Sequence, residues 1–325
     1  MKSIYKIFLG FLLFIMGVLT LFFFWASSPT LNEGECAKII THKYNNTINN
    51  DSIYSIITYN VGYLSGMTNN LPVAKPKKLF SDNQKKVESE LKKVNPDIIA
   101  FQEIDYNASR SYEIDQEEAF MNLGYNYAAR GVNWDERYVP FPYWPPSMHF
   151  GKVISGQSII SKYKLKEYER IVLERVPDNP FYRDALYLER LAQVVKVMLE
   201  GKEVVLINIH LEAFDKSTRV RQFEYVLNLF NKYKDKYPTI LLGDFNSRAR
   251  DAQAAVQKIF KMNGVGNAAF NVLNPSNTFN TKNPFERIDY IFYTKNSIEY
   301  VSGKVLNDFG QASDHLPVEM QFRLR

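Results

Sequence analysis

The feature that most constrains the fold is a set of short apolar runs that each lead into polar residues with catalytic potential. The central run, Ile240–Leu242, stops at Gly243 and is followed by Asp244 and Asn246. Residues two apart at the end of a strand can point to the same side, so both polar groups can reach into one cleft. An ordinary polar turn uses similar residues, and this run alone does not separate the two interpretations.

The same arrangement recurs along the chain. Apolar, strand-like runs precede or contain further polar residues, namely Asn60, Gln102-Glu103, His210, Asp289 and Asp314-His315. Turn chemistry does not explain strands that repeatedly deliver Asn, Glu, His and Asp. The pattern therefore predicts one polar site at the ends of a buried sheet.

Helical patterns are mixed with these strands. Apolar residues at helical spacing predict helices over 83–94 and 217–233, and a Gly201-Lys202 turn between two apolar runs predicts a hairpin. The mixture of strands and helices predicts one α/β domain over residues 52–325.

The amino-terminal segment predicts a membrane helix. Ile7–Trp25 is almost uninterruptedly apolar, with Lys2 and Lys6 before it. About 20 apolar residues are enough to cross the hydrocarbon core as a helix. Lysines before the span predict that the amino end is cytoplasmic and that the rest of the chain lies outside. The expected localisation is therefore single-pass membrane, with the catalytic domain outside the cytoplasm.

A cleaved secretory signal is the alternative for this segment. Its apolar stretch is usually about 7–15 residues long, which is shorter than the run found here. Ala26-Ser27-Ser28 resembles a cleavage site, but Pro29 follows directly and disfavours cutting. The sequence thus favours an uncleaved anchor over residues 1–26, followed by a polar tether over 27–51.

Charge and cysteine content exclude some classes. The chain has 40 Lys and Arg against 35 Asp and Glu, a net charge of +5 with neutral histidines. This mild excess does not indicate a nucleic-acid binder whose affinity comes from a basic surface. Cys36 is the only cysteine, so no disulfide within the chain stabilises the fold.

The strand-end residues also match a known family in order. The matching pieces are Asn60, Gln102-Glu103, Asn208-Ile209-His210-Leu211, Gly243-Asp244-Phe245-Asn246, Arg287-Ile288-Asp289-Tyr290 and Ser313-Asp314-His315. With them the chain resembles the endonuclease/exonuclease/phosphatase superfamily, the Mg²⁺-dependent phosphodiesterases and phosphatases related to DNase I and neutral sphingomyelinases. The resemblance implies a four-layer sandwich, with two mixed β-sheets packed face to face and helices outside.

The resemblance implies a metal site and an acid–imidazole pair. Glu103 would be the direct ligand of Mg²⁺, for which Mn²⁺ could substitute, since a hard cation prefers carboxylate oxygen. Asn60 would sit beside it and orient a metal-bound water or a phosphate oxygen. Asp314 and His315 would form the pair that takes a proton from the attacking water, and Asp289 would support His315 or the metal shell.

Three further residues receive roles from the same resemblance. Asp244 would position the attacking water, and Asn246 would donate hydrogen bonds to the phosphoryl oxygens. His210 would add a second donor as charge builds in the transition state. Arg219 and Gln222, which lie on the helix predicted after His210, are more typical of packing than of catalysis.

A loop over residues 137–150 bears on the substrate. It carries four prolines and the aromatic residues Tyr138, Phe141, Tyr143, Trp144 and Phe150. Because Tyr and Trp are favoured at membrane interfaces, the loop favours a phospholipid or sphingolipid head group as substrate. A satellite core formed by these aromatics, or stacking on nucleic-acid bases, are the alternatives.

The expected function is therefore a membrane-anchored, extracytoplasmic, Mg²⁺-dependent phosphodiesterase. A DNase I-like nuclease, a phosphatase of a small molecule and a catalytically inactive binding protein are the alternatives, since a fold alone does not fix a substrate. The sequence leaves the oligomeric state open.

Overall fold

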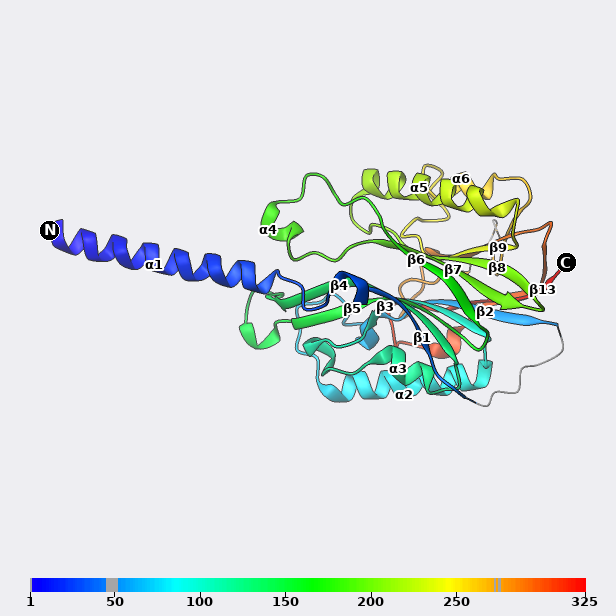
Figure 1. Cartoon of the computed structure of the whole chain (residues 1–325), viewed down its shortest axis with the longest axis horizontal. Coiled ribbons are helices and arrows are strands. Elements are labelled where there is room, and N and C mark those ends of the chain that lie inside the picture. Colours follow the sequence, from blue (N-terminus) through cyan, green and yellow to red (C-terminus); the bar gives the residue numbers. More distant parts are fainter. Residues whose placement is uncertain (1, 45–51, 272, 274–275) are drawn as a thin grey trace.

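Two β-sheets packed face to face form the centre of the protein, and helices cover the outer face of each sheet (Figure 1). The structure is a computed structural model that describes residues 2–44, 52–271, 273 and 276–325. Helices α2 (Lys77–Val94) and α3 (Gln116–Met121) lie outside one sheet, and α5 (Lys216–Lys234) and α6 (Gln257–Phe260) lie outside the other. The predicted four-layer sandwich is confirmed.

The first sheet has seven strands. Their order is β1 (Ala37–Thr41), β4 (Tyr127–Val139), β5 (Gly151–Ser161), β3 (Ile98–Asp105), β2 (Tyr54–Asn60), β13 (Val318–Leu324) and β12 (Ile298–Val305). β2 and β3 pair in parallel, and the other neighbours are antiparallel.

The second sheet has six strands. Their order is β10 (Val265–Asn267), β11 (Asp289–Thr294), β9 (Thr239–Asp244), β8 (Lys202–His210), β7 (Leu191–Leu199) and β6 (Leu165–Val172). β8 and β9 form its parallel pair. β7 and β8 form the predicted hairpin, and the predicted helices appear as α2 and α5. The remaining short helices are α4 (Phe181–Asp184), η1 (Glu33–Glu35), η2 (Gly62–Leu64), η3 (Ser109–Ser111), η4 (Pro146–Met148) and η5 (Asn307–Phe309).

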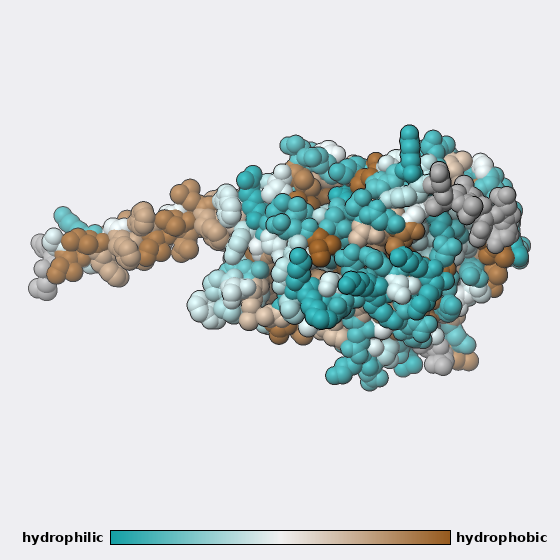
Figure 2. Space-filling view, turned by 90° about the horizontal axis from the view of Figure 1, so that it is seen from below, coloured by the Kyte–Doolittle hydropathy of each residue, from teal (hydrophilic) through white to brown (hydrophobic). Residues whose placement is uncertain are grey.

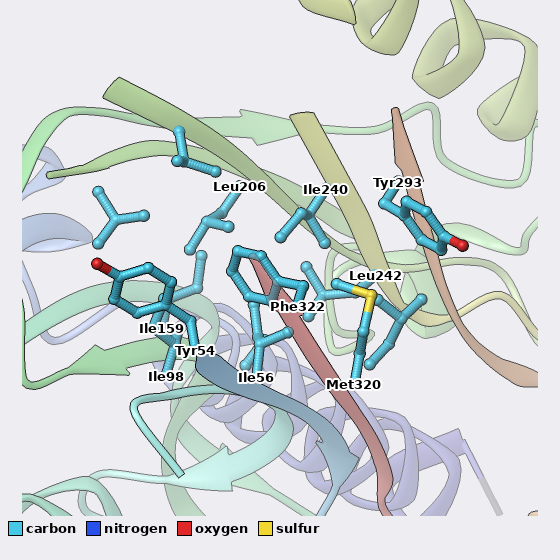
Figure 3. Close-up of a cluster of buried hydrophobic side chains, with 14 of the residues drawn as sticks. Tyr54, Ile56, Ile98, Ile159, Leu206, Ile240, Leu242, Tyr293, Met320 and Phe322 are labelled. Carbon is cyan, nitrogen blue, oxygen red and sulfur yellow. The ribbon is translucent and has the colours of Figure 1, made fainter. Parts of the chain in front are cut away.

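The central strands are apolar on both faces because each face is covered. Ile56, Leu206 and Ile240 belong to the cluster between the two sheets, where Figure 3 shows side chains from both sheets meeting. Their chain neighbours point the other way: Ile57 packs with the residues of α2, and Leu241 with those of α5. Successive strand residues point to opposite faces, so burial of both faces requires the unbroken apolar runs seen in the sequence.

Helix α1 (Lys2–Ala26) projects from one end of the domain (Figure 1), and its surface is apolar along its length (Figure 2). The stretch Ser3–Ala26 is long and apolar enough to cross a membrane. At about 1.5 Å per residue, its 24 residues extend over about 36 Å, slightly more than the hydrocarbon thickness of about 30 Å.

The segment after α1 differs from the predicted tether. Residues 37–41 form strand β1, which pairs with β4 from Ala37↔Gly131 to Thr41↔Tyr127. β1 satisfies backbone groups of β4 that would otherwise lie at an open sheet edge. The fold therefore begins well before residue 52, and of the predicted tether only residues 45–51 lie outside the described residues. The sequence hides β1 because most of its residues are exposed and lack apolar alternation.

The proline-rich segment over 137–150 is ordered, as predicted. Phe141 and Phe150 pack with Val139 and Val153 in a small separate cluster. Tyr143 and Trp144, in contrast, are 74% and 79% exposed. The aromatic residues of this segment therefore divide between a satellite core and an exposed tip.

Candidate active site

Strand register brings the predicted residues to one edge of the sandwich. In the second sheet, His210 at the end of β8 lies opposite Asp244, and Asp289 on β11 lies on the other side of Asp244. In the first sheet, Asn60 at the end of β2 pairs with Gln102. Parallel strands end at the same edge, so residues far apart in sequence converge.

His315 is held between two carboxylates. Its Nδ1 lies 3.0 Å from Asp289 Oδ2, and its Nε2 lies 3.8 Å from Asp244 Oδ2. Of the two carboxylates that the sequence analysis placed with His315, Asp289 accepts the Nδ1–H bond and fixes the imidazole, as a supporting carboxylate does, whereas Asp314 accepts a hydrogen bond from Asn69. Donor atoms of the three groups lie within 4.8 Å of one another.

The electrostatics of this group follow from burial and charge. Burial lowers the pKa of His315, but the Asp289 and Asp244 carboxylates outweigh burial and hold that pKa well above its usual value. Burial and the Asp289 carboxylate raise the pKa of Asp244 to about 7, against the opposing effects of His315 and Asn60. The group is therefore poised to take up and release a proton near neutral pH.

Asn60 supports Asp244. Its Nδ2 donates to Asp244 Oδ2 at 2.9 Å, and its Oδ1 accepts from the Gly62 N–H at 3.1 Å. The sequence placed Asn60 beside Glu103, whereas its amide bridges the Asp244 carboxylate and the loop that follows β2.

Glu103 and Asp314 form a second acidic group. Asn69 Nδ2 donates to Glu103 Oε2 at 2.8 Å and to Asp314 Oδ1 at 3.2 Å. Burial and the Asp314 carboxylate raise the pKa of Glu103. No lysine or arginine in the described part of the chain forms an ion pair with either carboxylate. Two partly buried carboxylates that share one amide donor suit a hard divalent cation.

The backbone at Glu103 is unusual. The pairing of β3 with β5 is irregular between Phe101 and Ile104, and Glu103 has a φ of 52°. A bulge re-aims a side chain, and a positive φ costs a non-glycine residue of order 1–3 kcal/mol. The bulge turns Glu103 out of the strand alternation and into the site.

The His210 imidazole forms a hydrogen bond with an arginine side chain. Arg190 Nη1 lies 2.7 Å from His210 Nε2, which must therefore accept the hydrogen bond. Burial, together with Arg190 and His315, lowers the pKa of His210 well below its usual value. The predicted donor role is therefore not available to Nε2 in this arrangement, and Nδ1 is buried without a hydrogen-bond partner within the described ranges.

Asn246 lies at the cavity wall. Its φ is 46°, its backbone N–H donates to Asp244 Oδ1 at 2.8 Å, and its Nδ2 donates to the Leu211 carbonyl at 2.9 Å. One amide N–H bond therefore fixes the side chain, while the second amide hydrogen is left for a ligand.

One cavity of about 1070 Å³ joins both acidic groups. Its wall includes Glu103, His210, Asp244, Asp314 and His315, and extends outward to the loop after β4 and to α4. The volume lies slightly above the usual range of ligand pockets, about 300–1,000 Å³.

Comparison with known proteins identifies the family of this site. The profile of the Endonuclease/Exonuclease/phosphatase family matches residues 57–315, a stretch that contains all of the site residues described above. The chain belongs to this family. The sequence-based recognition is thereby confirmed.

Several proteins resemble the chain over most of the family domain. YbhP of Escherichia coli K12, described as uncharacterized, is 24% identical over 238 residues, which cover 71% of this chain and 85% of YbhP. The endonuclease/exonuclease/phosphatase of Beutenbergia cavernae DSM 12333 superposes with a TM-score of 0.62 at 21% identity, covering 84% of this chain and 72% of that one. D. rerio TDP2, solved with a single-strand DNA product, superposes with a TM-score of 0.56 at 19% identity, covering 84% of this chain and all of that one. At these identities the solved structures support a shared fold.

Two residues of this family site escaped the sequence analysis. Arg190 is a lone cation directly before β7, and Leu191 pairs with His210, so the predicted hairpin could have pointed to it. Asn69 lies in an irregular loop and carries no periodic signal. Arg219 and Gln222 do fix the chain after β8, since they bond the Glu212 carbonyl and the Glu212 N–H, which agrees with a packing role.

Proposed function

We propose that this protein is a membrane-anchored, extracytoplasmic, Mg²⁺-dependent phosphodiesterase. The family consists of hydrolases that act on phosphate esters. The observation that carries the finer proposal is the pair of groups in one cavity: Glu103 with Asp314 in one group, and Asp244 with His315, which Asp289 holds from behind, in the other. One group suits a cation, and the other suits proton transfer.

Glu103 and Asp314 are the residues that would hold the metal. Their donors are partly buried carboxylate oxygens that face the cavity and form no ion pair with a lysine or arginine among the residues that the structure describes, as suits a hard cation. Bound there, Mg²⁺ would supply Lewis-acid stabilisation of the negative charge on the phosphoryl group and the leaving oxygen.

The chain's own residues would activate water. Asp244 orients a water molecule, and the His315 imidazole, fixed by Asp289, takes its proton as the water oxygen bonds to phosphorus. The bond from phosphorus to the leaving oxygen breaks, and that oxygen takes up a proton. The second amide hydrogen of Asn246 donates to a phosphoryl oxygen.

Removal of the metal tests this proposal. Turnover of a soluble phosphodiester by the full-length protein in detergent should fall to background in excess chelator and return with Mg²⁺. Glu103→Gln keeps the size of the side chain but removes its charge, and should raise the Mg²⁺ concentration for half-maximal activity by about tenfold or more. Glu299→Gln, on the exposed strand β12, is the matched control. Equal turnover with and without chelator would refute metal dependence.

The pH profile should follow from the raised pKa values of Asp244 and His315. Below these values both groups carry their proton, whereas the reaction requires an ionised Asp244 to orient the water and a neutral His315 to accept its proton. We therefore expect kcat/KM to increase as the pH rises through about 7, where Asp244 loses its proton, and to continue increasing at higher pH, because the pKa of His315 is held well above its usual value. Initial rates at saturating Mg²⁺ on a soluble diester measure the profile. A rate that falls over this range would contradict the assignment.

The anchor orientation needs a separate measurement. Lys2 and Lys6 precede the apolar run, and α1 continues directly into the fold. Protease added to intact cells or spheroplasts should therefore digest the domain, and the undigested protein should stay in the membrane fraction. A mature chain that begins between Ala26 and Leu31 and washes off the membrane would instead show a cleaved signal.

A lipid head group is the favoured substrate. Exposed Tyr143, in the cavity wall, and Trp144 next to it belong to the loop between β4 and β5, which lies at the same end of the domain as α1 (Figure 1). Nucleic acid is the alternative, because the similar fold of TDP2 was solved with a DNA product. A panel of liposomal phospholipid and sphingomyelin, single-stranded DNA and a soluble phosphomonoester separates these candidates. Cleavage of DNA without any lipid turnover would refute the lipid proposal.

A further inference from the structure

The last turn of α1 packs against the catalytic domain. The ring of Phe22 lies 5.7 Å from that of Tyr138 on β4, and Trp25 lies 6.4 Å from the same ring. Phe23 meets Phe181 of α4 edge to face at 5.8 Å. Aromatic pairs at these separations attract one another, so the helix end contacts both elements that flank the outer part of the cavity.

The chain that leaves α1 is also fixed. The Asp135 carboxylate accepts hydrogen bonds from the Thr30 N–H at 3.0 Å, the Leu31 N–H at 2.7 Å and the Thr30 hydroxyl at 2.6 Å. Two residues further along β4, the Arg137 N–H donates a hydrogen bond to the Ser28 carbonyl at 3.2 Å. These bonds attach the chain to the domain directly after the helix, without a free linker. We call residues 27–31 together with Asp135 the collar.

The surface around the collar is rich in exposed aromatic residues. Trp144 is 79% exposed and Phe181 is 75% exposed, and neither belongs to the cavity wall as formed by the described residues. Figure 1 shows α4 and the loop between β4 and β5 on either side of the base of α1. We call Tyr138, Trp144 and Phe181 the rim. Isolated exposed aromatics are common in soluble proteins, but Tyr138 and Phe181 contact a helix that can span a membrane, and Trp144 lies in the loop beside its base.

Length places the rim relative to a bilayer. From the last lysine before the span, Lys6, the apolar run Ile7–Trp25 extends over about 29 Å at 1.5 Å per residue, close to the hydrocarbon thickness of about 30 Å. The residues of α1 that contact the rim, Phe22 to Trp25, therefore form the outer end of the span, at the boundary with the head-group layer, where aromatic rings are favoured. Arg183, exposed beside Phe181 and part of the cavity wall, could pair there with a lipid phosphate.

We propose that the rim is a membrane-docking surface and that the collar holds the domain in one orientation, with the cavity opening at the head-group layer. This inference rests on the part of the proposed function in which α1 spans the membrane. Its partner is the lipid surface that contains the anchor. Substrate would then reach the site within the plane of the bilayer rather than from bulk solution.

A depth measurement tests the docking without using activity. Full-length protein carrying Cys36→Ser and Ser147→Cys is labelled with an environment-sensitive fluorophore and reconstituted into phosphatidylcholine–phosphatidylglycerol vesicles. Ser147 is exposed in η4, in the loop between β4 and β5 that also carries Trp144. The control probe, Lys202→Cys, lies next to the chain end opposite to α1, where Lys202 bonds the Arg325 carbonyl. Spin-labelled lipid should quench the probe at 147 and not the probe at 202. Equal quenching, or none at either site, would overturn the proposal.

Two sets of variants separate docking from collar rigidity. Asp135→Ala removes the acceptor of the collar and should broaden the depth distribution at position 147 while the protein stays membrane-bound. Trp144→Ser with Phe181→Ser should reduce quenching at 147 and lower liposomal turnover about tenfold, with turnover of a soluble diester within about twofold. Tyr225→Ser with Leu273→Ser, also exposed, is the matched control and should change neither.

The outcomes distinguish the two proposals. Quenching at 147 with no hydrolysis of any phosphate ester would refute the proposed activity and leave the docking surface standing. Turnover of lipid and of soluble diester that falls equally in the rim variant would refute docking as the cause, even in an active enzyme. Loss of quenching at 147 in the Tyr225→Ser, Leu273→Ser control would show that the signal is not specific to the rim residues, and would refute the docking surface.

Discussion

Replacing His315 by glutamine should reduce kcat/KM by about 10³–10⁴-fold while the protein remains folded. Glutamine can still donate an N–H to Asp289, which accepts from His315 Nδ1 at 3.0 Å, but its amide cannot take a proton from water. General base catalysis typically contributes 10²–10⁴-fold, and the loss of a charged partner beside Asp244 adds to the effect. Activity on a soluble diester at saturating Mg²⁺ measures the loss of kcat/KM, and the circular dichroism spectrum shows whether the variant is folded.

The matched control is His42→Gln. His42 lies beyond β1, where its ring contacts Tyr44, far from the cavity wall, so activity should stay within about twofold. An active His315→Gln variant would refute the assigned proton transfer. If Asp314→Asn proved more damaging to the pH profile than Asp289→Asn, the acid–imidazole pair would have to be reassigned to Asp314.

Substituting Gly243 by alanine should destabilise the fold by roughly 3–5 kcal/mol, the range of severe core disruptions. A Cβ atom at this position would lie 2.0 Å from the Ile209 carbonyl oxygen and 2.8 Å from the Ile209 nitrogen, and the φ of Gly243 is 138°. Backbone on β8 cannot give way without breaking its pairing with β9. Because His210 and Asp244 follow directly in register, the site should be lost along with stability.

Chemical denaturation of the full chain in detergent, followed by fluorescence, provides the measurement. Gly34→Ala is the control, since its Cβ would meet no atom within 4 Å, and its midpoint should match the wild type. A Gly243→Ala protein with unchanged midpoint and activity would mean that β8 and β9 do not approach as closely as this register requires.

The site was predictable to the extent that its residues are marked by local sequence. A buried strand needs an unbroken apolar run, and a polar residue at the end of such a run is conspicuous, as at Glu103, His210 and Asp244. Helices α2 and α5 were predictable for the same reason, because amphipathic spacing is a local property. Strand β1 was missed because an exposed edge strand requires no apolar pattern.

The sequence by itself determined most of the residues that gather at the site, their order along the chain and the presence of an apolar helix before the domain, but not Arg190 or Asn69. Only the tertiary structure decided that Asp289 rather than Asp314 bonds His315, and that Arg190 donates a hydrogen bond to His210 Nε2. It also decided that Asn69 joins Glu103 to Asp314, and that the chain after α1 is bonded to β4. These contacts join residues that are 20 to 245 positions apart. Asp289 and Asp314 carry identical side chains, so residue type cannot tell which of them bonds His315. Strand register and the direction in which each strand ends select the partner.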